Sequence, residues 1–194
     1  RPLQGQRQAP QPNRYGVARV RPLQGQRAPP SSVREQIMSR PNENAVEVKA
    51  LSVRPPWSEW IADGIKQVEN RTWQPPNNWR GTLAIHAGKT LDWDGFWFGS
   101  RLGHCLDDTE VARGEFIAVV NLVAVHRAGA VHCGEQCREW GAPDCWHWML
   151  ADARRIVSIE WRGRLGLFAP PIDVIEQVTA LAAAARPGRR RRDR

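Results

Sequence analysis

Short stretches in which apolar residues alternate with polar ones, or run nearly unbroken, recur between residues 47 and 169. They predict strands at residues 47–53, 67–73, 81–87, 115–126 and 163–169, and one or two more within 146–159. The run at 115–126 is almost continuously apolar, which indicates a strand buried on both faces. Helical spacing predicts helices at 57–63, 92–105 and 172–185, while 74–79 reads as a turn and 128–145 as a loop.

Five to seven short strands with two or three helices predict an α+β fold, a small closed β-barrel with the helices packed outside it. We expect this domain to span residues 47–185, with Trp60, Trp97 and Trp148 in its core. Residues 1–46 are rich in Arg, Pro and Gln and are predicted to be a disordered tail, as is the basic segment 186–194. A polar unit recurs at 1–10 and 21–30, and Met38 is an alternative start that would exclude residues 1–37.

The positive charge of the chain is concentrated at its two ends. The chain of 194 residues has a net charge of +8, of which residues 1–44 contribute +6 and residues 186–194 contribute +5, so the body carries −3. The body is therefore not expected to present a broad basic face, although the tails are expected to contact nucleic acid nonspecifically. No apolar run reaches the roughly 20 residues of a membrane span, and no signal-peptide core is seen at the N-terminus, so we expect a cytoplasmic protein with reduced thiols and no membrane contact.

The stretch from residue 50 to residue 89 combines charged side chains with tryptophans, a composition that suits a pocket for a planar polar ligand. Lys66 and Glu69 are the candidate catalytic pair: a desolvated lysine beside another cation is an activated nucleophile or base, and Glu69 would relay its proton. The alternative is an ordinary surface ion pair. In a straight strand the two side chains would point to opposite faces, so they meet if Lys66 belongs to the turn after Gly64.

The remaining candidates in this stretch are expected to bind the ligand. Arg54 and Arg71 suit a phosphate or carboxylate, the alternative being that they pair with Glu59 and Glu69. Trp57 and Trp73 are the candidates for stacking on a base, and Glu69 and Asn70 are the candidates for reading its hydrogen-bonding edge. His86 is either a residue of the cleft or a structural group.

Three segments of this stretch carry a resemblance to a known family. They are Leu51-Ser52-Val53-Arg54-Pro55-Pro56-Trp57, then Gly64-Ile65-Lys66-Gln67-Val68-Glu69-Asn70-Arg71, then Ile85-His86-Ala87-Gly88-Lys89. Together they resemble the ASCH domain, a branch of the PUA-like β-barrel superfamily, and His147-Trp148 and the segment 163–168 extend the likeness over residues 47–170. The resemblance implies a small PUA-like barrel and binding of RNA or a modified nucleobase.

The same resemblance implies an enzymatic alternative. Some small bacterial proteins similar to this chain are amidohydrolases that remove an acetyl group from acetylated cytidine. Their motif has Lys at the position of Lys66 and Thr where this chain has Glu69, and Glu115 is a candidate for their additional catalytic Glu. A third hypothesis is a non-catalytic interaction module.

Four cysteines are present, three of them within 128–145. Thiolates and imidazoles are the ligands of tetrahedral zinc sites. The residues that would form a Cys3His site are Cys133, Cys137, Cys145 and His147, although their spacing is not the tight Cys-x2-Cys of zinc ribbons, and free thiols in a loop are the alternative.

Overall fold

A computed structural model describes residues 47–131 and 133–184. The described chain is α+β and is built around one six-stranded sheet with the strand order β2-β5-β4-β3-β1-β6. The strands are β1 (Val48–Val53), β2 (Val68–Arg71), β3 (Gly81–Ala87), β4 (Glu115–Arg127), β5 (Trp146–Glu160) and β6 (Leu167–Phe168). The helices are α2 (Trp57–Ala62), α3 (Trp93–Arg101), α4 (Glu135–Trp140) and α5 (Ile172–Ala184), with a short 3-10 turn η1 (Pro76–Asn78).

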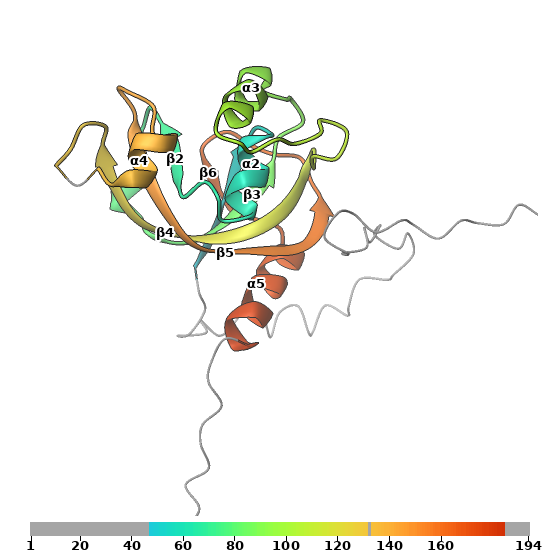
Figure 1. Ribbon diagram of the computed structural model, residues 1–194. Helices are drawn as coiled ribbons and strands as arrows, with labels where there is room; N and C mark the ends of the chain where they lie inside the picture. Colours follow the sequence, from blue (N-terminus) through green and yellow to red (C-terminus); the bar gives the residue numbers. More distant parts are fainter. Residues whose placement is uncertain (1–46, 132, 185–194) are drawn as a thin grey trace, which may run out of the picture.

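The sheet curls into a half-barrel rather than closing completely (Figure 1). β1 runs parallel to β3, and every other pairing in the sheet is antiparallel. Figure 1 shows α2 inside the curl and α5 against its outer side. Register shifts along the β4–β5 pair accompany this curvature, because an extra residue in one strand bends it and increases its twist.

Two apolar clusters pack on the two sides of the sheet. Leu83 and Ile85 of β3 join Ile61 and Ala62 of α2 on the inner side, while Ala84 joins a cluster with α5 on the outer side. The alternation predicted for residues 81–87 is therefore confirmed, and both faces of the strand are buried. The sheet thus needs a helix on each face, which α2 and α5 supply.

The structure differs from the sequence-based prediction at several elements. Residues 128–145, predicted to be a loop, contain α4, so four α-helices occur in the described residues instead of two or three. The strand predicted at 163–169 shrinks to Leu167–Phe168, whereas residues 146–159 lie in one long strand, the first of the two possibilities expected there. Trp97 was expected in the core but is 71% exposed.

The exposure of Trp97 follows from the packing of α3. Gly95 and Gly99 lie one turn apart and face the core, where a Cβ on Gly99 would come within 2.1 Å of the Trp60 ring. Their lack of side chains lets the indoles of Trp57 and Trp60 fill that side of the helix, so Trp97 is turned toward solvent.

The predicted tails, 1–46 and 186–194, lie outside the described residues, as does the last residue of the predicted domain. None of the helices within 47–184 that the structure describes is long and apolar enough to cross a bilayer.

Candidate functional site

A cleft of about 560 Å³ opens where the end of β1, the start of α2 and the edge strand β2 meet. Six of the predicted site residues line it: Arg54, Trp57, Lys66, Glu69, Asn70 and Arg71. Five further residues complete the lining: Ser52, Val53, Gly88, Asp92 and Leu165. The charged side chains among these eleven residues are three cations and two carboxylates, so the cleft has a slight excess of positive charge.

A buried ion cluster forms the floor of the cleft. Lys66 Nζ lies 2.9 Å from Glu69 Oε2, and Arg71 Nη2 lies 3.0 Å from Glu69 Oε1, so both carboxylate oxygens have a cationic partner. Lys66 is 2% exposed and Glu69 is 7% exposed. Burial by itself would raise the pKa of Glu69, but the charges and hydrogen bonds of Lys66 and Arg71 outweigh burial and hold that pKa below 4.5. Glu69 is therefore a carboxylate at neutral pH.

The local backbone explains how Lys66 reaches Glu69. α2 ends at Ala62, Gly64 follows with a φ of +73°, and the backbone N–H of Lys66 donates to the carbonyl of Trp60. Lys66 thus belongs to the turn before β2, which begins at Val68, and its Nζ also donates to the Val68 carbonyl. Lys66 therefore lies in the turn after Gly64, which was the condition under which its side chain was expected to meet that of Glu69.

Arg71 ties together two ends of the curled sheet. β2 is the edge strand at one end of the strand order, and β1 lies beside the edge strand at the other end. Arg71 Nη2 donates to the Ser52 carbonyl of β1 at 2.8 Å while it also binds Glu69. The barrel was expected to close by strand pairing. In the structure it stays open, and the side chain of Arg71 bridges the gap beside the cleft.

Trp57 is held in a fixed orientation at the wall of the cleft. Its Nε1 donates to Asp92 Oδ2 at 3.0 Å, and the other oxygen of Asp92 caps α3 by accepting from the Gly95 N–H at 3.1 Å. Gly95 packs so closely that a Cβ there would lie 2.8 Å from the Trp57 ring. Lys66 Nζ lies 5.7 Å from the centre of the same ring, within the range of a cation–π contact. Asp92 was not among the predicted site residues; the sequence placed it inside the helix predicted at 92–105, whereas in the structure it caps that helix.

Asn70 lines the cleft, but its amide already binds the segment that contains α4. Nδ2 donates to the Trp140 carbonyl at 2.8 Å, and Oδ1 accepts from the Ala142 N–H at 3.0 Å. The predicted role of Asn70, reading the edge of a base, is therefore less direct than its role in positioning residues 140–142 beside the cleft.

His86 and Trp73 lie outside the lining of the cleft. The His86 ring is 1% exposed and lies between Ser52 Oγ at 3.3 Å and the Trp161 carbonyl at 3.0 Å. Burial lowers the pKa of His86 from its ordinary value of 6.5. Trp73 packs edge-on against Trp148, whose Nε1 donates to the Trp73 carbonyl at 3.3 Å. The structure thus places both in the surrounding packing, as the alternative interpretation of His86 expected.

Arg54 is exposed on the rim of the cleft. The carboxylates considered as its alternative partners are engaged elsewhere. Glu59 pairs with Arg155 at 2.7 Å, and Glu69 is bound by Lys66 and Arg71. Arg54 thus adds an exposed cation at the rim to the two cations at the floor of the cleft.

Comparison with known proteins places the chain in a family. The model of the ASCH domain matches residues 51–160, more than half of the sequence, and this range contains the whole ion cluster. The chain belongs to the ASCH domain family. A crystal structure of ASCH from Zymomonas mobilis resembles this ASCH domain with a TM-score of 0.43 and 13% identity, covering 69% of this chain and 94% of that one.

Crystal structures of two mutants of the Zymomonas mobilis protein also match, each with a TM-score of 0.42, at 14% and 13% identity. They cover 69% and 71% of this chain, and 97% of the other chain in both cases. A search of curated proteins gave no match.

Outside the cleft, the ASCH domain brings together four sulfur and nitrogen ligands. The residues are His126, Cys133, Cys137 and His147, so three of the four predicted zinc ligands meet, with His126 where the prediction had Cys145. His126 was not among the predicted ligands because it lies near the end of β4, outside the cysteine-bearing segment, and only the pairing of β4 with β5 brings it opposite His147.

Proposed function

We propose that this ASCH domain binds RNA or a modified nucleobase in the cleft beside Trp57. The observation that carries the proposal is the fixed indole of Trp57 at a cleft of about 560 Å³ whose floor is a buried, hydrogen-bonded ion cluster. Pockets for small planar ligands combine an apolar wall with a few oriented polar groups, and this cleft has both. The family match is compatible with this role but does not name a ligand.

The contacts suggest how a base would be held. A base would stack against Trp57, whose orientation is set by Asp92 and Gly95 before any ligand arrives, so little side-chain entropy is lost on binding. Lys66 and Arg71 are the cationic donors nearest the floor, and they suit a carbonyl oxygen on the edge of the base. Arg54 on the rim suits a phosphate of the same nucleotide.

The charge distribution favours a small, local contact rather than a broad one. Residues 45–185 carry a net charge of −3, so the domain itself would not attract a long stretch of nucleic acid. The basic ends, 1–44 and 186–194, would add affinity that is independent of sequence and weakens with salt. The proposed specificity therefore belongs to the cleft.

The Lys66–Glu69 pair favours a second candidate function, an amidohydrolase acting on a modified nucleoside. Hydrolysis of the acetyl amide of acetylated cytidine adds water across the C–N bond and gives acetate and cytidine. Lys66 would have to lose a proton to act as nucleophile, and Glu69 Oε2 at 2.9 Å is the acceptor within reach. A carboxylate whose pKa is held below 4.5 is a weak acceptor, which is why binding is the preferred proposal.

The first experiment identifies what the protein carries. The full chain is purified from cells, and any bound RNA or small molecule is extracted and analysed by mass spectrometry. Its affinity, or that of short single-stranded RNA if nothing is bound, is then measured by calorimetry for the wild type, Arg54→Ala and the matched control Arg154→Ala. Arg154 is an exposed arginine of β5 that does not line the cleft.

We expect Arg54→Ala to weaken binding by about tenfold, equivalent to one lost charged contact of about 1.4 kcal/mol, and Arg154→Ala to change it little. Equal loss in both variants would mean that binding is nonspecific and the cleft proposal is wrong. Cytidine released from acetylated cytidine by the wild type but not by folded Lys66→Ala would favour the enzyme. If no molecule is bound to the purified protein and calorimetry detects no binding of RNA, the third hypothesis, a non-catalytic interaction module, would be favoured.

A further inference from the structure

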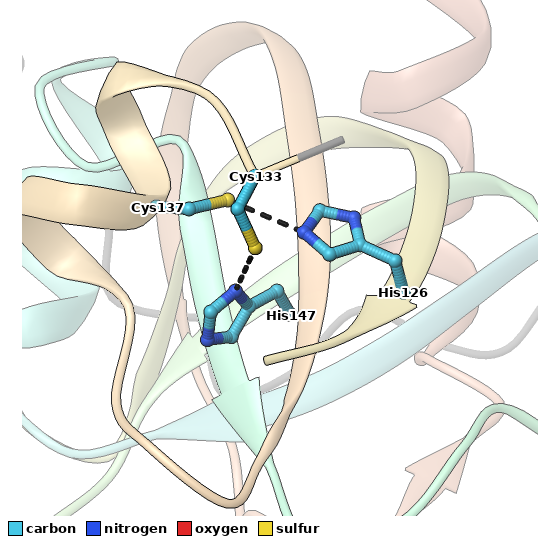
Figure 2. A group of neighbouring side chains, drawn as sticks. All are labelled: His126, Cys133, Cys137 and His147. Carbon is cyan, nitrogen blue, oxygen red and sulfur yellow. Dashed lines mark hydrogen bonds between the residues drawn. The ribbon is translucent and has the colours of Figure 1, made fainter. Parts of the chain in front are cut away.

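A group of four side chains that can bind a metal lies where the two longest strands, β4 and β5, are joined, and none of the four lines the cleft. His126 near the end of β4 is paired across the sheet with His147 near the start of β5. Cys133 precedes α4 and Cys137 lies in its first turn, so the connection between the two strands folds back over the histidines. Figure 2 shows the two sulfurs and the two rings converging on one point.

The distances in this group are close to those of a tetrahedral zinc site. All four ligand atoms lie within 4.8 Å of one another. Cys137 Sγ is 3.3 Å from His126 Nε2, and Cys133 Sγ is 3.8 Å from His147 Nδ1. With Zn–S near 2.3 Å and Zn–N near 2.05 Å, a tetrahedron has sulfur–nitrogen edges of about 3.6 Å. The two observed distances bracket this value, so small rotations of the side chains would seat an ion.

A second, independent observation concerns the outer nitrogen of His147. His147 Nε2 lies 2.9 Å from the Ala142 carbonyl, which can only accept, so Nε2 carries the proton. In the neutral ring Nδ1 is then the nitrogen with a lone pair, and it faces Cys133 Sγ at 3.8 Å. Metal-ligating histidines typically donate their other N–H to a backbone carbonyl in this way. Gly141 makes room for the ring, since a Cβ there would lie 2.6 Å from His147 Cε1.

The chemistry of the ligand set points to one ion. Two thiolates and two neutral imidazoles around Zn²⁺ give a site with no net charge, which lowers the cost of burying it; Cys137 and His147 are buried. From this geometry we infer that His126, Cys133, Cys137 and His147 form a Cys2His2 zinc site. Four protein ligands leave no open position, so the ion would be structural rather than catalytic.

The site would also stabilise one border of the ligand cleft. The segment fixed by the ion continues from Cys137 to Trp140 and Ala142, both of which bind the amide of Asn70. The ring of Trp140 packs edge-on against Trp57, with centroids 6.5 Å apart. Loss of the ion would therefore loosen α4 first and the Trp57 side of the cleft second. The metal site itself does not depend on the identity of the cleft ligand.

Metal analysis of the purified full chain under reducing conditions tests this inference. We expect about one zinc ion per wild-type chain, and about one Co²⁺ after exchange, with the intense visible absorption of a tetrahedral site and a sulfur-to-cobalt charge-transfer band. Because Cys137 is buried and its variant is at risk of misfolding, the informative variants are Cys133→Ser and His126→Gln, with circular dichroism as a check of folding. Both should lose the ion.

Two cysteine variants serve as controls. Cys145→Ser and Cys105→Ser should keep the full zinc content, because neither sulfur belongs to the group. The inference is overturned if the reduced wild type binds no zinc, or if Cys145→Ser loses the ion while His126→Gln retains it. It is equally overturned if mass spectrometry of the native protein shows a disulfide between Cys133 and Cys137 in place of metal.

Discussion

Glu69 is the carboxylate that holds the floor of the cleft together, and replacing it tests the reasoning about the site directly. Glu69→Gln keeps the shape of the side chain and removes its charge, leaving Lys66 and Arg71 without their shared anion. We expect the variant to lose about 3–5 kcal/mol of unfolding free energy, the range for breaking one partner of a buried ion pair.

The magnitude follows from the distances and the burial. At an effective dielectric constant of about 20, unit charges 3 Å apart attract by about 5–6 kcal/mol, and desolvation of the partners offsets much of this. The desolvation of Lys66, which is 2% exposed, persists after Glu69 is neutralised, so the variant loses the attraction and keeps the cost. The matched control is the pair Lys49–Glu47, in which the side chain of Glu47 is 68% exposed. Glu47→Gln should lower the free energy of unfolding by under about 1 kcal/mol.

Urea unfolding followed by tryptophan fluorescence, at several pH values, measures both variants. The pKa of Glu69 is depressed in the folded state, so its contribution to stability is full above 4.5, its ordinary value, and is lost as the pH falls through the folded-state pKa. The gap between wild type and Glu69→Gln should therefore narrow on acidification below 4.5. A loss under about 1 kcal/mol at pH 7, or a gap that widens in acid, would refute the reasoning.

Three other expectations concern the core. The lowered pKa of His86 means that the folded state prefers the neutral ring, so the free energy of unfolding should fall as the pH drops below 6.5. In urea titrations from pH 7 to 5, His86→Gln should make the free energy of unfolding less dependent on pH. Gly99→Ala should cost about 1–3 kcal/mol in thermal unfolding, because the new Cβ would meet the rigid ring of Trp60; an unchanged midpoint would contradict the packing of α3. Arg155→Met should lower the free energy of unfolding in urea by about 3 kcal/mol, because it removes the guanidinium that lies 2.7 Å from the buried carboxylate of Glu59. A gain in stability would contradict the importance of this ion pair.

Local patterns in the sequence were enough to place most of the secondary structure. The alternation at 81–87 and the apolar run at 115–126 correspond to β3 and β4, because period-2 burial is a property of neighbouring residues. Gly64 likewise marked the end of α2 and allowed Lys66 to turn back toward Glu69. The segments between residues 51 and 89 also sufficed to recognise the ASCH family.

The partners of each polar side chain depended on long-range packing. Arg71 and Gly88 line the cleft, yet Trp73 and His86, two residues away from them in the chain, do not. His86 lies against the Trp161 carbonyl, and Trp73 packs on Trp148, contacts that span about 75 residues of sequence. Two further features were not predicted because they too depend on contacts between distant segments. Trp97 is exposed because Trp57 and Trp60 pack on the glycine side of α3. The helix α4 contacts Asn70 of β2 through the Trp140 carbonyl.

By itself, the sequence determined most of the strands, the family and six residues of the cleft lining, because these rest on residues close together in the chain. Tertiary structure decided that the barrel stays open, with Arg71 reaching Ser52 across the gap, and that His126 rather than Cys145 meets Cys133, Cys137 and His147. Both outcomes depend on strand curvature and register, which bring together residues far apart in the chain.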